Sequence, residues 1–69
     1  MTTALTTAHL NLILTALNDR EGVLSTDYEA AQRANSDALV ASIRAELRDV
    51  RALADLIANQ LIVAKRLAA

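Results

Sequence analysis

His9 is the only histidine of the 69-residue chain, and imidazole is a side chain that can transfer protons or bind a metal. Both tasks need partners: a catalytic histidine works beside a nucleophile and a carboxylate, and a zinc ion takes three or four protein ligands. The chain has no cysteine, and no acidic residue precedes Asp19. We therefore expect His9 to be a surface or interface residue of a helix.

Acidic residues flank Gly22, the only glycine, which raises the question of a calcium-binding loop. When Gly22 is aligned with the glycine of an EF-hand loop, the first ligand position falls on Leu17 and the twelfth on Tyr28. Neither residue offers the carboxylate that calcium needs. We also find no pair of carboxylates spaced for acid–base catalysis, so the sequence predicts no enzyme, no cofactor and no metal.

Arg44, Arg48 and Arg51 form a basic row along one side of a helix and are the best candidates for contact with a polyanion. Acidic residues from Glu46 to Asp55 lie among them, the chain has a formal charge of −1, and aromatic residues make up only 1% of it. Stacking on nucleic-acid bases is therefore poorly supported. We expect a solvated helix flank and no nucleic-acid binding.

The composition favours helix throughout, because hydrophobic residues make up 54% of the chain and proline is absent. A core of this size rarely supplies more than about 3–5 kcal/mol of stability. Since neither disulfides nor a metal can reinforce it, we expect association with other chains.

The uncharged segment from Thr2 to Asn18 could be a targeting or membrane segment. No basic residue precedes Arg20, whereas a signal peptide starts with a basic region. Threonines, asparagines and His9 interrupt the apolar run, whereas a membrane helix needs about 20 mostly apolar residues. We expect neither a signal peptide nor a transmembrane segment, no membrane association, and a cytoplasmic or virion location.

Apolar residues at spacings of three and four predict an N-terminal helix over about residues 4–20. Gly22 is expected to end this helix in a left-handed conformation, with Val23 packing back on it. Thr26 and Glu29 have the form of a capping box and predict a second helix over about 26–68. The expected fold is an all-α helical hairpin that turns at Gly22, Val23, Thr26 and Glu29. A break near 35–37 is the alternative, and it would give a three-helix bundle.

The second predicted helix carries a heptad pattern of apolar residues from Val40 onward. A helix over 4–20 would reach only to about residue 41, so we expect residues 1–45 to form the hairpin and 46–69 to protrude as an oligomerisation helix. Leucines beside the seam, such as Leu53 and Leu67, widen it. The predicted oligomer interface comprises Val40, Ile43, Leu47, Val50, Leu53, Ala54, Ile57, Leu61, Ala64 and Leu67.

This architecture predicts a non-enzymatic structural or adaptor protein. The residue types of the seam favour a homo-oligomer of three or four chains. A parallel arrangement is expected because antiparallel helices would bring Arg44, Arg51 and Lys65 close to like charges, whereas parallel helices place Glu46 of one chain beside Arg51 of the next. We expect the oligomer to dock on a larger assembly through another protein, as a virion or phage component would. The alternative is a small regulatory protein, such as an inhibitor, that binds one target protein through its apolar helix face.

Overall fold

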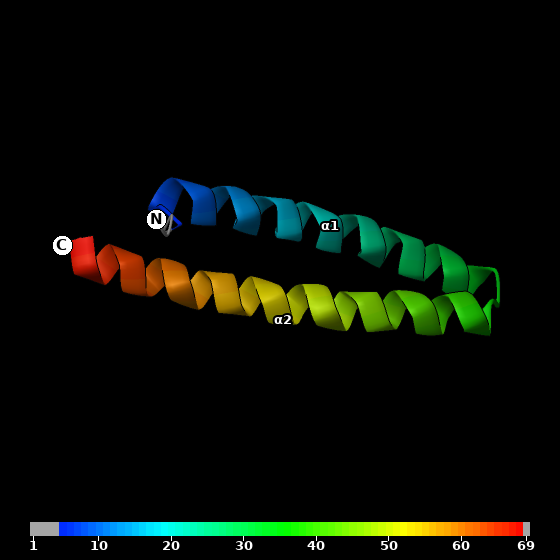
Figure 1. Cartoon of the computed structure of the whole chain (residues 1–69). Helices are drawn as coiled ribbons and strands as arrows, with labels where there is room; N and C mark the ends of the chain where they lie inside the picture. Colours follow the sequence, from blue (N-terminus) through cyan, green and yellow to red (C-terminus); the bar gives the residue numbers. More distant parts are fainter. Residues whose placement is uncertain (1–4, 69) are drawn as a thin grey trace.

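The computed structural model describes residues 5–68, which form two antiparallel α-helices joined by a short turn (Figure 1). Helix α1 spans Thr7–Arg33 and helix α2 spans Asp37–Ala68. The prediction of an all-α helical hairpin is confirmed. Met1–Ala4 and Ala69 lie outside the described residues, and with them the predicted start of the first helix near residue 4.

Helix α1 begins with a capping box in which His9 has a structural task. The Thr6 hydroxyl oxygen accepts the backbone N–H of His9 at 3.1 Å, and the His9 Nδ1 atom accepts the backbone N–H of Thr6 at 3.3 Å. Both backbone donors belong to the first turn, where no helical carbonyl can receive them. His9 is exposed, as the sequence predicted, and it stabilises the helix end through its ring nitrogen.

The predicted turn at Gly22 is wrong. Gly22, Val23, Thr26 and Glu29 all lie inside α1, and the backbone of Gly22 has a negative φ. The Thr26 hydroxyl donates to the Gly22 carbonyl oxygen at 3.2 Å, one helical turn back, so it does not cap a new helix. A glycine inside a helix costs only about 1 kcal/mol relative to alanine, and continuing the helix buries Leu24.

The chain reverses at Ala34, Asn35 and Ser36. Asn35 has a φ of 56°, the left-handed conformation that asparagine adopts more readily than other residues with a Cβ. Its N–H donates to the Gln32 carbonyl at 3.1 Å, and the Ser36 N–H donates to the Ala31 carbonyl at 3.1 Å. These two bonds are those of a Schellman motif. The alternative prediction of a break near 35–37 therefore gives the correct position of the turn. The predicted three-helix bundle is wrong, because the break separates only two helices in the described residues.

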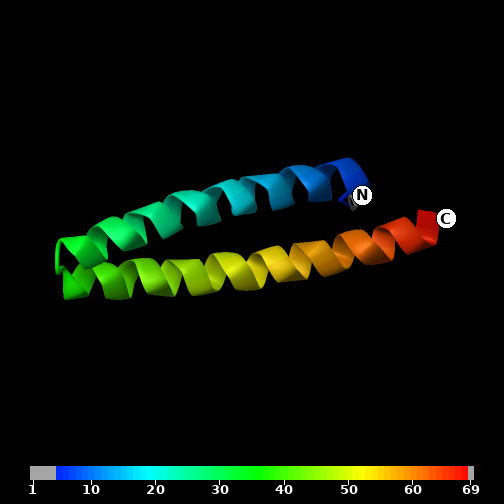
Figure 2. The ribbon, with the colours of Figure 1, turned by 180° about the vertical axis from the view of Figure 1, so that it is seen from behind.

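The core is a heptad seam between the two helices. Helix α1 contributes one apolar residue at every seventh position: Leu10, Leu17, Leu24 and Ala31. The buried cluster near the turn consists of Leu24, Ala31, Ile43 and Leu47. The cluster near the open end, where the two helices have their free ends, consists of Leu10, Ile57 and Leu61. These two clusters join the helices both near the turn and near the open end. The side views show the two helices running antiparallel beside each other (Figures 1 and 2).

The expectation that residues 46–69 protrude from the hairpin is also wrong. A first helix of 27 residues extends about 40 Å at 1.5 Å per residue, so it reaches the far end of α2. Leu10 packs against Ile57 and Leu61 of the segment that was expected to lack a partner within the chain. The error follows from the misplaced turn, because a helix ending near residue 20 would be too short to cover α2.

Candidate functional site

The residues predicted to form an oligomer interface fall into two groups. Eight of them face α1 of the same chain. Ile43, Leu47, Ile57 and Leu61 are buried, and Val40, Val50, Ala54 and Ala64 are partly buried. Two remain exposed: Leu53 at 44% and Leu67 at 82%. The heptad pattern did identify a buried face, but α1 covers it, so this seam offers little surface to another chain.

Charged residues on the two helices pair across the seam. The Arg20 Nε atom donates to Glu46 at 2.9 Å, and the Arg51 Nε atom donates to Glu21 at 3.1 Å. The expected contact of Glu46 with Arg51 of a neighbouring chain is replaced by these contacts within the hairpin. Because all four side chains are at least a third exposed, each pair contributes only about 0–1 kcal/mol. Their effect is mainly on the register of α1 against α2.

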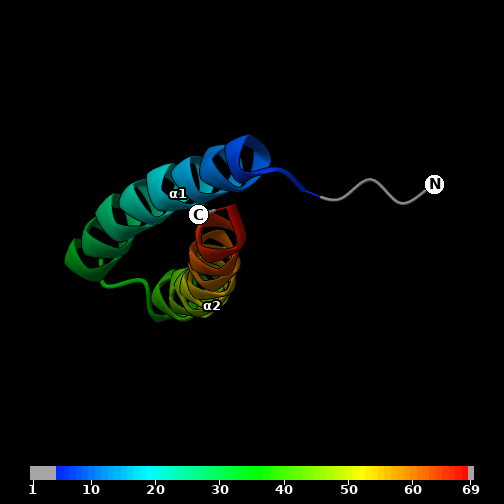
Figure 3. The same cartoon turned by 90° about the vertical axis from the view of Figure 1, so that its left-hand side faces the viewer.

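The hairpin is one pair of helices, and no other described segment covers its sides (Figure 3). Residues at one heptad position stay on one side of a supercoiled helix, so each side can be identified from the sequence. On α2, the positions that follow d include Arg44, Arg51 and Lys65, whereas the positions that precede a include Leu39, Leu53 and Leu67. We name the first side the polar face and the second side the apolar face.

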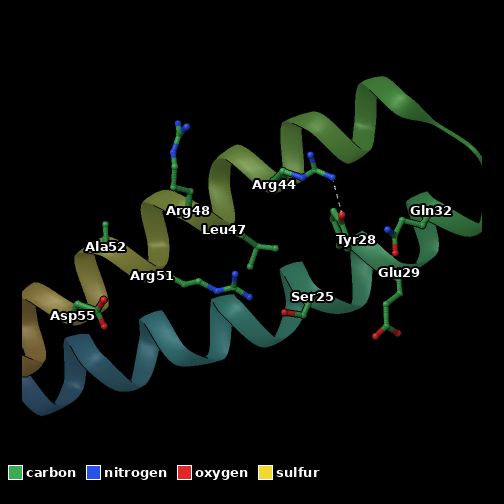
Figure 4. A pocket seen from close by; sticks show the side chains of 10 residues that line it. All are labelled: Ser25, Tyr28, Glu29, Gln32, Arg44, Leu47, Arg48, Arg51, Ala52 and Asp55. Atoms are coloured by element: carbon green, nitrogen blue, oxygen red, sulfur yellow. Dashed lines mark hydrogen bonds between the residues drawn. The ribbon is translucent and has the colours of Figure 1, made fainter.

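The polar face contains all three arginines of the predicted basic row (Figure 4). Arg44 donates to the Tyr28 hydroxyl at 3.0 Å and lies 5.9 Å from the centre of its ring. The hydrogen bond to Tyr28 raises the pKa of Arg44 above its already high usual value. Arg48 lies 3.5 Å from Asp49 and points away from the groove, and Arg51 is paired with Glu21.

This arrangement matches a solvated flank better than an anion site. The groove on the polar face is wide and open, with a volume of about 860 Å³. Glu29 and Asp55 line it together with the arginines, so the basic charge there is partly cancelled. Tyr28 is the only aromatic side chain of the chain, and its hydroxyl is engaged with Arg44. A polyanion would find neither a continuous row of unpaired arginines nor a stacking surface.

The apolar face carries large aliphatic side chains that the hairpin itself does not bury. On α2 they are between 44% and 82% exposed: Leu39, Leu53, Leu56, Val63 and Leu67. Near the open end, Leu56, Val63 and Leu67 form one wall of a groove of about 460 Å³, to which Leu5 and Leu10 contribute from the other side. Val23 of α1 is also half exposed on this side of the molecule. This face is the candidate functional site of the protein.

Helix α1 presents smaller residues to the apolar face, with Ala16, Val23 and Ala30 at heptad spacing. A second groove of about 500 Å³ lies nearer the turn, and Ala30, Leu39 and the Arg20–Glu46 pair line it. The apolar face is therefore rich in leucine on α2 and rich in alanine on α1, and the Arg20–Glu46 pair and Asp27 interrupt it nearer the turn. Its chemistry supports packing against another apolar protein surface.

The sequence analysis missed the heptad pattern of α1. Leu10, Leu17, Leu24 and Ala31 repeat every seven residues straight through the segment that contains Gly22. This continuity was the available signal that the helix does not stop there. With α1 extended, the seam of α2 is covered within the chain, and the flanking leucines become the exposed surface.

Three features that often mark a functional site were searched for in the described part of the chain. Residues 5–68 contain no group of three histidine, cysteine or acidic side chains close enough to hold a metal ion. In the same range, neither helix has a segment long and apolar enough to cross a membrane. Buried polar side-chain atoms without a hydrogen-bond partner are also absent from this range.

Comparison with known proteins gives no relative from which a function could be transferred. No protein-family model matches the chain, and no curated protein and no solved structure matches it significantly.

Proposed function

We propose that this protein is a non-enzymatic structural or adaptor protein that self-associates through its apolar face and docks on a larger assembly, in the cytoplasm or in a virion. The observation that carries the proposal is the gathering of exposed leucine and valine on one side of the hairpin, opposite a side rich in charged residues. Monomeric proteins seldom leave large apolar side chains gathered on one side in water.

The surface area of the chain supports association. The hairpin exposes 5211 Å², whereas a compact monomer of 7.4 kDa exposes about 4,200 Å². Its radius of gyration is 15.6 Å, compared with about 11 Å for a compact domain of this length. The excess of about 1,000 Å² is close to the area of about 800 Å² that one partner buries in a stable interface.

The residue types of the seam no longer support the predicted oligomer of three or four chains. That prediction rested on a seam between chains, and α1 of the same chain occupies that seam. What remains from the sequence is the expectation that α2 contacts a third or fourth helix through Leu53, Leu56 and Val63. Two hairpins packed through their apolar faces would supply four helices.

The second candidate function is that of a small regulatory protein, such as an inhibitor, that uses the same face on one target protein. The groove at the open end favours it, because Leu5, Leu10 and Leu56 line a hollow that an apolar helix of another protein could fill. In that case the purified chain would be a monomer.

The test is the mass of the native particle, measured by sedimentation and by light scattering over a dilution series. Leu56→Glu places a charge on the apolar face, and we expect it to yield monomers at concentrations where the parent chain is associated. Ile62→Glu is the matched control, because Ile62 lies on α2 with a similar exposure, 49% against 53%, but on the polar side. A parent chain that is monomeric at every concentration would overturn self-association. Dissociation by Ile62→Glu and not by Leu56→Glu would show that the wrong side was chosen.

A further inference from the structure

We infer that the partner seated on the apolar face is a second copy of this chain with its turn at the same end, so that a twofold axis runs along the length of both hairpins. This inference rests on the proposed self-association and specifies its geometry. The product is a four-helix bundle of two chains, and three observations carry it: the level of each residue along the hairpin, the sizes of the facing side chains, and the position of one charged pair.

The contacts across the seam establish which residues of α1 and α2 lie at the same level. Tyr28 bonds to Arg44 and Glu21 bonds to Arg51, so residues at equal distance from the turn lie side by side. The Arg20–Glu46 pair is offset in the other direction, so on average the levels are symmetric about Asn35. Ala30 is then nearly level with Leu39, and Ala16 is nearly level with Leu53. Rotation about the long axis leaves every residue at its own level. It also brings α1 of one copy opposite α2 of the other, because the two helices exchange sides.

The facing side chains then complement each other in size. Leu39 of one copy faces Ala30 of the second copy, and Leu53 faces Ala16 of the second copy. Bundle cores are built from such alternation of large and small residues, which lets neighbouring layers interdigitate without voids. At the open end, the two grooves lined mainly by Leu5, Leu56 and Val63 face each other and close into one largely apolar layer, with Asn59 and Gln60 also in its lining.

The charged pair on the apolar face also fits this arrangement. Arg20 and Glu46 form an ion pair within each hairpin and therefore lie at nearly the same level. In the same-end dimer, Arg20 of one copy comes opposite Glu46 of the second copy. Two arginines and two glutamates then alternate around the bundle, so each arginine has a glutamate of the second copy opposite it.

Packing with the turns at opposite ends lacks this complementarity. In that dimer, α2 packs antiparallel against α2 of the second copy. A residue on one side of the helix midpoint then meets the residue that lies equally far on the other side of the midpoint in the second copy. When the copies are centred, Leu56 lies opposite Asp49 of the second copy and Val63 lies opposite Ser42 of the second copy. The exposed leucine and valine of the open end would then face polar residues, and a carboxylate would lose water without a partner.

The natural chain has no cysteine, so an introduced one reports on a single position. We suggest measuring the distance between spin labels on an Ala38→Cys variant by pulsed dipolar spectroscopy, because Ala38 is exposed and lies next to the turn. The same-end dimer places the two labels less than about 30 Å apart, since neighbouring helix axes in a bundle are about 8–10 Å apart. The opposite-end dimer separates them by a distance close to the 50 Å length of the hairpin.

Disulfide formation provides a second, independent measurement. An Ala16→Cys chain mixed with a tagged Leu53→Cys chain is expected to form the mixed disulfide under mild oxidation, whereas Leu53→Cys alone is expected to stay reduced. A disulfide between two Leu53→Cys chains, or a label distance near 50 Å, would overturn the same-end geometry while leaving self-association intact. A native mass of three or more chains would overturn the two-chain bundle. A monomeric mass would overturn both this inference and the proposed function.

Discussion

Replacing Gly22 by alanine is the sharpest test of where this chain turns. A turn at Gly22 predicts a decrease in the free energy of unfolding, whereas a turn at Asn35 predicts an increase. In the structure Gly22 lies inside α1 with a negative φ, and a Cβ added to it would meet no atom within 4 Å. The substitution therefore introduces no clash. It removes the cost of a glycine inside a helix, which is about 0.8–1.0 kcal/mol relative to alanine.

We expect Gly22→Ala to raise the free energy of unfolding by about 1 kcal/mol, which corresponds to an increase in Tm of about 4–8 °C for a domain of this size. The assay is thermal and urea unfolding followed by circular dichroism. Parent and variant must be compared at the same chain concentration, because association adds a stability that depends on concentration. Ala45→Gly is the matched control: Ala45 is an exposed residue inside α2, and its replacement should lower the stability by a similar amount.

A Gly22→Ala variant less stable than the parent chain would refute this reasoning. A glycine in the left-handed conformation loses stability when it acquires a Cβ, and that result would return the turn to Gly22. Helix α1 would then end before Leu24, and the cluster that joins Leu24 to Leu47 would have to be abandoned.

Three further predictions concern the turn, the core and the helix start. Asn35→Ala is expected to lower the stability by about 1 kcal/mol because Asn35 is left-handed, whereas Asn35→Gly should be neutral or stabilising; equal effects of the two variants in urea unfolding would argue against the Schellman turn. Leu24→Ala is expected to lower the free energy of unfolding by about 2–5 kcal/mol because Leu24 is only 3% exposed, whereas Leu12→Ala, at 71% exposure, should change it by no more than about 0.5 kcal/mol. A larger loss for Leu12→Ala than for Leu24→Ala in urea unfolding would contradict the assigned seam. Thr6→Ala removes the acceptor for the His9 backbone N–H and should cost about 0.5–2 kcal/mol, with faster amide hydrogen exchange confined to the first turn of α1; unchanged exchange there would show that the capping box does not form in solution.

Several features of the fold and the site could be read from the sequence because each depends on residues close together in the chain. Helix content follows from the abundance of alanine, leucine and arginine and from the absence of proline. The buried face of α2 follows from its heptad pattern, in which Leu47 and Leu61 hold equivalent positions and are both buried. The polar character of the arginine row follows in the same way from the acidic residues among its members.

The position of the turn and the partner of the seam could not be read in this manner. A glycine, an asparagine or a capping threonine each shifts the local preference by only about 1 kcal/mol, so signals at Gly22 and at Asn35 compete on nearly equal terms. The decision comes from residues far apart in the chain. Turning at Asn35 lets Leu10 meet Ile57 and Leu24 meet Leu47, and each such burial contributes about 1.5–3 kcal/mol.

The same long-range packing determined which apolar residues remain outside. From the sequence, Leu47 and Leu53 were equally good candidates for an interface, because both belong to one broad apolar stripe of α2. Once α1 extends to Arg33 and covers the seam, Leu47 is 6% exposed and Leu53 is 44% exposed. The sequence by itself determined that α2 has more apolar surface than one helix can cover. Only the tertiary structure decided which part α1 buries, because that depends on summed burial along the whole hairpin and not on any single residue.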